Sequence, residues 1–344
     1  QSKQGELRLP FMLTMKILFS ADHHIKLGAK NVPQEWQKNR FILLGEKLDE
    51  VFGATGCDLH IIGGDIMDVS DPSSEEVELL FAFLATLQHP GIIYTGNHEM
   101  KSKTISCLDH YAAAISDATD GLWKVVKDYR SPEFDIIPYS SLHKASWKPR
   151  VSDICFTHVR GAIPPHVVPE IDLERFVEHG YSKVFAGDLH SYKNSQKIGD
   201  IDLLYPGSPL TTSFHRERTK GTNGAFIIDT VLPRDHEHYL SWVELGDLPQ
   251  LIRKTIEVGE PMEADAYDRV IYEVTGDVSQ LKTLKNSELL DKKINNRVTK
   301  DAKLDLDDMS LLQELDTYFT NVQKLDEASR TRILKRAAEY VDSN

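Results

Sequence analysis

The stretch KILFSADHH at residues 16–24 decides the fold, because an apolar run of strand length ends directly in a cluster of polar side chains. A helical pattern follows over residues 35–52. The succession then recurs: residues 59–62 lead into Gly-Gly-Asp, a helix is expected after Ser73, and residues 91–95 lead into Gly-Asn-His-Glu. Strands that alternate with helices predict an α/β fold with largely parallel, layered sheets.

The chain divides by pattern into several parts. Further strands of the first part are expected at residues 154–157, 183–186, 203–205 and 225–228. After residue 246 the pattern changes to a Pro-containing connection, a Val/Ile/Tyr run and long charged helical stretches. We therefore expect a core over residues 15–246, a smaller α+β unit over residues 247–300 and C-terminal helices over residues 301–344. Residues 1–14 read as an added extension and are excluded from the fold.

Composition narrows the class of protein. A chain of 344 residues with 40% hydrophobic and 27% charged residues is ordinary for a globular protein of two or three units. Its apolar runs fall short of the roughly 20 residues that cross a bilayer, and a secretory leader is not recognisable. The three cysteines form no CxxC pair, which argues against a disulfide framework and a thiolate zinc site. A cytoplasmic location fits best.

The charge balance bears on the class of partner. A net charge of −13 counts against a nucleic-acid partner, because contacts to phosphates need Lys and Arg. Carboxylates that bind divalent cations add to this sum without repelling a substrate once metal is present. The acidic balance therefore lowers the expectation of a nucleic-acid partner without removing it.

Polar side chains of three types follow the predicted strands where each strand ends. They are Asp22, His24, Asp65, Asn97, His98, His158, Asp188 and His190. The carboxyl ends of strands in α/β sheets are where ligands bind, so these residues are expected to meet in one crevice. Carboxylate, amide and imidazole donors without a thiolate suit hard to borderline divalent ions. Mn²⁺ is the first expectation, with Mg²⁺, Fe²⁺ and Zn²⁺ as alternatives.

The number of such elements favours a joint site. One histidine at a strand end is more often a hydrogen-bonded structural residue than a metal ligand, but here five elements follow in order. Two metal ions about 3.5–4 Å apart need a bridging carboxylate, and Asp65 is well placed for that role. The preceding Gly63-Gly64 pair allows the backbone to turn and approach closely.

Several motifs together resemble the calcineurin-like metallophosphoesterase superfamily. They are Asp22-x-His24, Gly64-Asp65, Gly96-Asn97-His98-Glu99, His158 and Gly187-Asp188-Leu189-His190. Within it, MKILFSADHH, GGDIMD and Tyr-Pro-Gly-Ser-Pro at residues 205–209 look like the SbcD group of nuclease subunits, which belong to ATPase and nuclease complexes that process double-strand DNA breaks. The motifs cover residues 15–230, and the compact length is compatible with a bacteriophage version.

The resemblance implies a sandwich of two central sheets flanked by helices, and roles for the side chains. One metal ion would be held by Asp22, His24, Asp65 and His190. The other would be held by Asp65, Asn97, His158 and the residue at position 188. His98 would stabilise or protonate the leaving oxygen, and Glu99 would orient His98 or its loop. Asp68 is expected to support a ligand and His23 to be a neighbour.

Asp188 departs from the family pattern, which has His in a Gly-His-x-His element. A third carboxylate would harden the site and favour manganese or magnesium over zinc. We expect Asp188 to bind metal because it remains a competent ligand. The alternative is that it does not bind and that the second metal ion is held loosely.

The resemblance also implies DNA as the substrate and protein partners. Residues 247–300 would form a capping domain that positions DNA, and the terminal helices would dock on a coiled-coil ATPase of the SbcC type. Apolar stripes in those helices fit a partner surface or packing on each other or on the core. A homodimer through the core is expected. The best basic cluster is His215, Arg216, Arg218 and Lys220, which is either a phosphate contact or a solvated loop.

Three functions remain open on this evidence. The first is a manganese-dependent DNA exonuclease and endonuclease subunit for DNA recombination, repair and replication. The second is a small-molecule phosphodiesterase or phosphomonoesterase, which needs the same metal ions without a cap or partner helices. The third is a non-catalytic architectural subunit whose altered Gly-Asp-Leu-His element has lost one metal ion.

Overall fold

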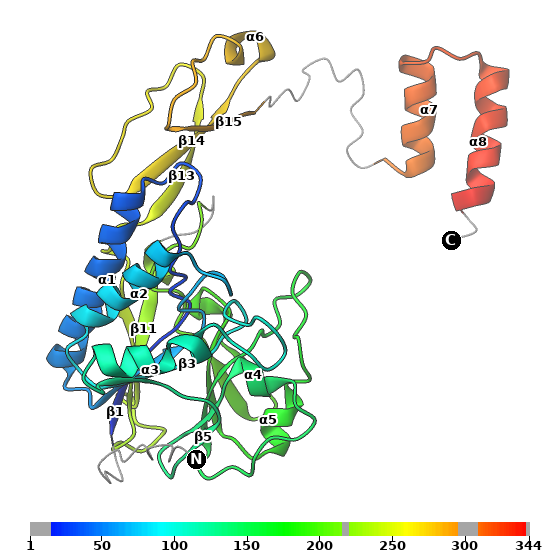
Figure 1. Ribbon diagram of the computed structural model, residues 1–344. Coiled ribbons are helices and arrows are strands. Elements are labelled where there is room, and N and C mark those ends of the chain that lie inside the picture. Colours follow the sequence, from blue (N-terminus) through cyan, green and yellow to red (C-terminus); the bar gives the residue numbers. More distant parts are fainter. Residues whose placement is uncertain (1–14, 215–219, 295–308, 342–344) are drawn as a thin grey trace. The chain divides into compact units, whose positions relative to one another are not determined.

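Two six-stranded mixed sheets form the larger part of the chain (Figure 1). The computed structural model describes residues 15–214, 220–294 and 309–341. The first sheet has the order β12-β11-β1-β2-β3-β4. Its strands are β1 (Lys16–Ser20), β2 (Leu59–Gly63), β3 (Gly91–Tyr94), β4 (Trp123–Val125), β11 (Gly224–Asp229) and β12 (Leu240–Glu244). The strands β1 to β4 are parallel, and β11 pairs antiparallel with β1 and with β12.

The second sheet has the order β5-β6-β7-β8-β10-β9. Its strands are β5 (Tyr129–Arg130), β6 (Asp135–Ile137), β7 (Ile154–His158), β8 (Lys183–Gly187), β9 (Gln196–Ile198) and β10 (Ile201–Leu204). The four central strands are parallel, and the edge strands β5 and β9 pair antiparallel with their neighbours. The predicted layered α/β core with two central sheets is therefore confirmed.

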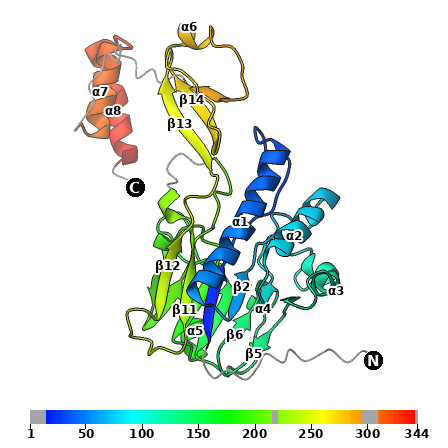
Figure 2. The ribbon, with the colours of Figure 1, turned by 90° about the vertical axis from the view of Figure 1, so that its left-hand side faces the viewer.

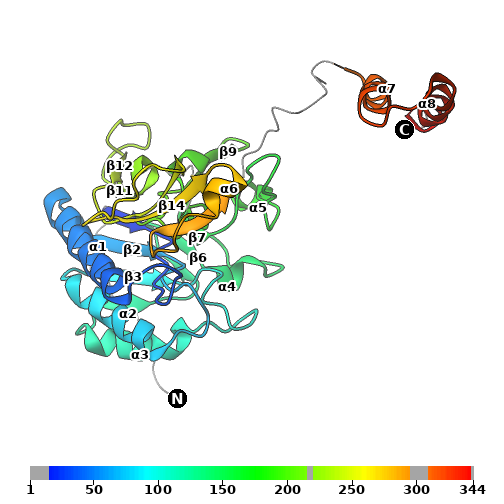
Figure 3. The ribbon, with the colours of Figure 1, turned by 90° about the horizontal axis from the view of Figure 1, so that it is seen from above.

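Helices cover the outer faces of the two sheets. They are α1 (Gln34–Thr55), α2 (Ser74–Thr86), α3 (Leu108–Ala118), α4 (Tyr139–Leu142) and α5 (Glu174–Glu178), with 3₁₀ turns at Tyr192–Asn194 and Lys220–Thr222. Figure 3 shows α1 and α2 on one side of β2 and β3, with β6 and β7 beyond them. Helix α2 begins after Ser73 because Ser73 and Glu76 cap each other's backbone N–H groups.

The alternation of side chains along β1 assigns the layers. Leu18 points toward the helices, where it packs with Leu44 of α1 and Leu80 of α2. Ile17 and Phe19 point the other way and pack between the two sheets. A third core forms where the outer face of the second sheet meets α4 and α5. Figure 2 shows α1 and α2 side by side beside the first sheet.

The chain falls into two compact units. The first comprises residues 1–255, 261–272 and 287–291, and the second comprises residues 256–260, 273–286 and 292–344. The strands β13 (Leu251–Glu257), β14 (Arg269–Thr275) and β15 (Leu290–Ile294) form a three-stranded sheet whose residues belong partly to each unit. The division expected at residues 246 and 300 stays a prediction.

The second unit also contains helices. They are α6 (Val278–Leu281), α7 (Leu311–Asn321) and α8 (Glu327–Val341). Helix α7 begins with a capping box of Ser310 and Gln313, and an ion pair between Arg330 and Asp316 joins it to α8. Among the described residues, no helix has the length and hydropathy needed to span a bilayer.

Candidate metal centre

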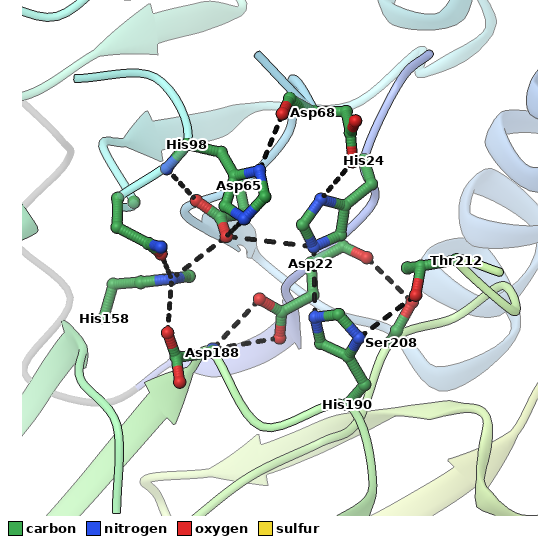
Figure 4. A network of polar contacts seen from close by, with 12 residues as sticks. Asp22, His24, Asp65, Asp68, His98, His158, Asp188, His190, Ser208 and Thr212 are labelled. Carbon is green, nitrogen blue, oxygen red and sulfur yellow. Dashed lines mark hydrogen bonds and ion pairs between the residues drawn. The ribbon is translucent and has the colours of Figure 1, made fainter. Parts of the chain in front are cut away.

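The predicted side chains meet where strands of both sheets end (Figure 4). Asp22 and His24 follow β1, Asp65 follows β2, and Asn97 and His98 follow β3. From the second sheet, His158 ends β7, and Asp188 and His190 follow β8. The parallel registers align these ends, since Gly63 pairs with Tyr94 and His158 with Gly187. The structure therefore brings together all eight residues that the strand-end pattern selected.

The turns that carry these side chains have an unusual backbone. Asp22, His24, Asp65 and Asp188 have positive φ values of 59°, 52°, 51° and 99°. Non-glycine residues adopt such angles rarely, and they persist where the surrounding structure fixes them, often at functional sites. Here the Asp22 N–H donates to the Gly64 carbonyl at 3.1 Å and the His24 N–H donates to the Asp65 carbonyl at 2.9 Å. These bonds align the first two turns.

The turns that carry these residues lie so close together that two of their positions have no room for a side chain. Gly64 has φ 83°, and a Cβ there would lie 2.6 Å from Nδ1 of His158. A Cβ on Gly96 would collide with the Asp65 carboxylate. The glycines at these two turns are thus required by the packing of the donors themselves.

Glu99 fastens the Asp65 turn to the turn after β3. Its carboxylate accepts hydrogen bonds from the backbone N–H groups of Gly96 (2.7 Å), Asp65 (3.2 Å) and Met67 (2.9 Å). Burial and the nearby charge of Asp65 raise the pKa of Glu99 to about 7. Glu99 therefore holds the loop in place, as its position beside His98 predicted.

The imidazole of His158 is oriented as a ligand. Its Nδ1 donates to the Gly63 carbonyl at 2.9 Å, which fixes the tautomer. Its Nε2 then faces three oxygens: Asn97 Oδ1 at 2.9 Å, Asp65 Oδ2 at 3.4 Å and Asp188 Oδ1 at 4.0 Å. A neutral Nε2 would place its lone pair against oxygen lone pairs, so this arrangement requires a cation or a proton between them.

His24 and His190 are also oriented as ligands, because each has a polar partner at Nδ1. The Nδ1 of His24 is 3.1 Å from Asp68 Oδ1, and the Nδ1 of His190 is 3.2 Å from Thr212 Oγ1. The two Nε2 atoms face each other at 3.1 Å. Histidines that bind metal commonly have the other ring nitrogen held by such a partner. Asp68 thus supports His24, as predicted, and Thr212 supports His190.

Asp65 lies at the centre of the cluster. Its Oδ2 is 3.4 Å, 3.8 Å and 3.9 Å from the Nε2 atoms of His158, His24 and His98. Burial opposes ionisation of Asp65, but the charge and hydrogen bond of His158 and the charge of His24 outweigh it and lower the pKa of Asp65. Burial and the charge of Asp65 raise the pKa of Asp22 to about 6. The buried carboxylates therefore depend on positive charge close by.

His98 lies at the edge of the cluster. Its Nδ1 donates to the Asp68 carbonyl at 2.6 Å, and its side chain is 39% exposed. Its ring stands edge-on to the ring of His24, with 4.7 Å between centroids. The other imidazole nitrogen is therefore turned toward Asp65, on a side chain that solvent and a substrate can reach.

Asp188 makes a contact that the sequence did not predict. Its carboxylate receives the Nε of Arg160 on Oδ2 at 3.0 Å and the Nη2 on Oδ1 at 3.2 Å. Its backbone N–H donates to the Asp22 carboxylate at 2.9 Å. Position 188 is thus at the cluster, as expected, but its carboxylate is shared with a guanidinium.

Two further groups complete the surroundings. The hydroxyl of Ser208, in the Tyr-Pro-Gly-Ser-Pro segment, donates to the Asp22 carbonyl at 2.8 Å. His23 is buried and turned away from the cluster, with its Nε2 2.9 Å from Ser20 Oγ. It is a neighbour, as expected. The predicted basic residues His215, Arg216 and Arg218 lie outside the described residues.

The donors fit divalent metal ions. Three sets of side chains have ligand atoms within 4.8 Å of one another: Asp22, His24 and His190; His24, Asp65 and His98; Asp22, Asp65 and His158. None of these sets includes a cysteine, and the three cysteines are buried and free. Carboxylates suit borderline divalent ions, and so do imidazoles whose tautomers are fixed by hydrogen bonds.

Comparison with known proteins agrees with this site. Residues 15–159 match the family described as calcineurin-like phosphoesterase. Over 328 residues the chain is 66% identical to "Probable exonuclease subunit 1" of Escherichia phage T5, which covers 95% of this chain and 99% of that protein.

Two solved structures are also similar at low scores. The protein TT1561 of Thermus thermophilus has a TM-score of 0.41 at 12% identity, covering 67% of this chain and 99% of that one. The nuclease MPE of Pseudomonas putida has a TM-score of 0.29 at 15% identity, covering 61% of this chain and 84% of that one. The family assignment rests on the sequence matches: the chain belongs to the calcineurin-like phosphoesterases.

Proposed function

We propose that this protein is a DNA nuclease subunit, with exonuclease and endonuclease activity, that hydrolyses phosphodiester bonds with two divalent metal ions. Mn²⁺ is the preferred ion for a site of carboxylates, imidazoles and one amide. The phage T5 relative, named as an exonuclease subunit, supports a nuclease that works in an assembly. Roles in DNA recombination, repair and replication form part of the same proposal.

The central position of Asp65 carries this proposal. Asp65, like Asp22 and His24, belongs to two of the three donor sets, and its Oδ2 faces histidines from both sheets. Asp22, His24, Asp65 and His190 would hold one ion. Asp65, Asn97 and His158 would hold the other, with Asp188 as a shared ligand. A single carboxylate between two donor sets is what a two-metal phosphoesterase needs.

Different side chains would have different roles in the proposed reaction. Divalent ions held by these sets would supply Lewis acidity for hydrolysis of a phosphodiester by water. Asp68 and Thr212 fix the tautomers of His24 and His190. His98, held at Nδ1 by the Asp68 carbonyl, would present Nε2 to the leaving oxygen and pass it a proton.

A pocket beside the candidate metal centre supports the proposal that the substrate is a polymer. It has a volume of about 440 Å³ and includes Thr212, the hydrogen-bond partner of His190. Lys26, Lys30 and Arg253 also line it, together with Asp291, which is 3.1 Å from Arg253. Cationic side chains beside a phosphodiesterase site are suited to the further phosphates of a DNA strand. We propose that residues 247–300, which contribute Arg253, form the capping domain that positions DNA.

The helices α7 and α8 support a protein partner. They are neighbours in Figure 1, and α7 has no buried residue. Leu311 and Val322 are 56% and 42% exposed, and Leu312, Leu315 and Phe319 are only half-buried. An exposed apolar face of this kind is typical of a helix-docking surface. We propose that it binds the coiled coil of an SbcC-like ATPase, and that the nuclease core forms a homodimer.

DNA cleavage by the full chain tests the proposal. End-labelled duplex and single-stranded DNA would be incubated with Mn²⁺, with and without the ATPase partner. We expect cleavage by the wild type and its loss in Asp65→Asn and His98→Ala. Asp200→Asn and His110→Ala make the same chemical changes at exposed positions and should leave cleavage intact.

Each alternative function predicts a different result. Turnover of a chromogenic phosphodiester that duplex DNA does not inhibit would point to a small-molecule phosphodiesterase. One tightly bound metal ion per chain, with DNA binding but no cleavage under any condition, would point to an architectural subunit.

A further inference from the structure

Another cavity, separate from the pocket lined by Lys26 and Thr212, adjoins the candidate metal centre on the side of Asn97. Its volume is about 700 Å³, and we call it the Tyr139 pocket. One wall comes from residues 97–104 and the other from residues 139–144. Asn97 belongs to both places, because its Oδ1 is 2.9 Å from Nε2 of His158. The pocket therefore begins where a phosphodiester at the proposed second metal position would continue.

The charges of this pocket differ from those of the whole chain. The protein has a net charge of −13, yet the described residues that line the pocket include two lysines and His143 and no carboxylate. Lys103 is exposed and makes no ion pair within the described ranges of the chain. Lys144 is 3.4 Å from Asp128, and His143 is 3.9 Å from Glu170. The lining suits a ligand that carries negative charge, such as a phosphate.

The same pocket offers surfaces for a flat ring. Tyr139 lines it beside Met100. An aromatic ring stacks on nucleobases of any sequence, and the polarisable sulfur of methionine packs well against aromatic rings. The volume lies within the roughly 300–1,000 Å³ typical of small-ligand pockets. One nucleoside with an adjacent phosphate is the ligand that combines these features.

The fold sets Tyr139 in place before a ligand arrives. Its backbone N–H donates to the Thr95 carbonyl at 3.0 Å, which ties α4 to the end of β3. Leu142 of α4 is buried in the third core with Trp147. The Tyr139 ring stands edge-on to the ring of His158, with 6.3 Å between centroids. The distance from the metal centre to the stacking surface is thus fixed by packed elements.

We infer that the Tyr139 pocket binds the unpaired nucleotide next to the scissile phosphodiester, with its base on Tyr139 and its phosphate near Lys103. This inference rests on the proposed function and adds a substrate class. A base stacked within a duplex has no free face for Tyr139, so the inference requires a nucleotide beside the cut that is single-stranded or freed from a duplex end.

Matched variants of the full chain test the inference. Tyr139→Ala removes the ring and Tyr139→Phe keeps it, while Lys103→Gln removes the cation. Lys197→Gln is the control, because Lys197 is exposed on the edge strand β9. The probes are a fluorescein-labelled ten-nucleotide oligothymidylate, measured with Ca²⁺ to slow cleavage, and bis(p-nitrophenyl) phosphate hydrolysis with Mn²⁺.

We expect Tyr139→Ala to weaken oligothymidylate binding by about tenfold, from the typical effect of losing one base-aromatic stack. Tyr139→Phe should stay within about twofold, and Lys103→Gln should weaken binding and reduce its salt dependence. Lys197→Gln should match the wild type both in oligothymidylate binding and in hydrolysis of the small diester, because Lys197 lies outside the lining of the Tyr139 pocket. Equal binding by wild type and Tyr139→Ala would overturn the inference.

A crosslink in the wild type gives a test that does not depend on the variants. An oligothymidylate with 5-iododeoxyuridine at one end would be irradiated on the protein and the adduct mapped by mass spectrometry. An adduct within residues 100–104 or 139–144 supports the inference, and adducts only elsewhere overturn it. If the small diester is hydrolysed but DNA is neither bound nor cut, the proposed function itself fails.

Discussion

Arg160 and Asp188 form a two-point ion pair beside the candidate metal centre, with N···O distances of 3.0 Å and 3.2 Å. The Asp188 side chain is almost fully buried, whereas that of Arg160 is 43% exposed. The guanidinium therefore neutralises a buried carboxylate at the position where the family has histidine. Oδ1 of Asp188, which accepts the hydrogen bond from Nη2 of Arg160, also lies 4.0 Å from Nε2 of His158. A metal ion bound beside His158 would therefore compete with Arg160 for Asp188.

This competition predicts the behaviour of Arg160→Gln. Without metal, the buried carboxylate loses its charged partner, and the free energy of unfolding should fall by about 1–3 kcal/mol. With metal, Asp188 is released as a ligand, so Mn²⁺ should bind more tightly than to the wild type. Urea denaturation in EDTA and titration calorimetry with Mn²⁺ measure the two effects. Arg150→Gln, at an exposed position, is the control. Unchanged Mn²⁺ affinity would show that Asp188 takes no part in binding.

Metal stoichiometry tests the central role of Asp65. The wild type should retain two Mn²⁺ ions per chain after dialysis, measured by mass spectrometry of the metal. His190→Gln removes a donor from one set only and should retain about one ion, whereas Asp65→Asn removes a donor that both sets share and should retain less than one. Asp200→Asn should keep two. Equal loss in His190→Gln and Asp65→Asn would contradict separate sites joined by Asp65.

Glu99→Gln should disturb the site without touching a metal ion. The two oxygens of Glu99 accept three backbone N–H groups, and an amide has only one oxygen to offer. The unpaired donors should lower the free energy of unfolding by about 1–3 kcal/mol and shift the turns that carry Asp65 and Asn97. The measurement is urea denaturation together with Mn²⁺ titration. Glu75→Gln, on the exposed side of α2, is the matched control. Wild-type stability and Mn²⁺ affinity in Glu99→Gln would refute this role.

The sequence pattern selected the residues of the cluster because each stands at the end of a strand or within a few residues after it. Asp65 and Asn97 could be assigned to one crevice from the strand pattern, since the parallel strands β2 and β3 share a carboxyl edge. His158 ends a strand of the other sheet, so its place beside Asp65 depends on how the two sheets pack. Arg160 and Thr212 were missed because their roles depend on contacts made only after folding, at Asp188 and at His190.

The same limit applies to the fold. Apolar runs predicted seven strands of the two sheets, which are β1, β2, β3, β7, β8, β10 and β11. The two-residue strand β5 and the three-residue strands β4, β6 and β9 are too short for a periodic signal and form by pairing with neighbours already in the sheet. Helix α3 was also missed, since Leu108 and Ile115 are its only buried positions in the described structure.

A series of buried side-chain hydrogen bonds at the first sheet predicts that the stability of the protein depends on pH. His60 lies between Ser20 (2.8 Å) and His89 (3.0 Å), and His89 continues to Asp49 (2.6 Å). Burial first, and then the charge of His89, lower the pKa of His60 well below its ordinary value of 6.5. Folded His60 stays neutral where the unfolded chain takes up a proton. Its contribution to stability is thus complete above pH 6.5 and is lost as the pH falls toward the folded pKa.

His60→Gln isolates this contribution. Near pH 7.5 the variant should be less stable than the wild type by about 1–3 kcal/mol, because two buried partners lose their hydrogen bonds. That gap should narrow by up to about 1.4 kcal/mol for each pH unit below 6.5, since only the wild type loses the histidine contribution. Urea denaturation in EDTA across this range measures it, with His110→Gln as an exposed control. A gap independent of pH would mean that folding does not change the pKa of His60, and it would refute this contribution.

The apolar face of α7 gives the prediction for the protein partner. Leu311→Glu and Val322→Glu place charges at exposed positions, so they should leave the helical circular dichroism signal and the thermal unfolding midpoint nearly unchanged. Co-elution with the SbcC-like ATPase in size-exclusion chromatography should nevertheless be lost, because a buried charge in a helix-docking interface costs several kcal/mol. Asn321→Glu adds the same charge at the exposed end of α7, and it should co-elute like the wild type. If both leucine and valine variants still co-elute, the ATPase docks elsewhere and the exposed face has another use; if Asn321→Glu also fails, added negative charge rather than the loss of apolar contact prevents binding.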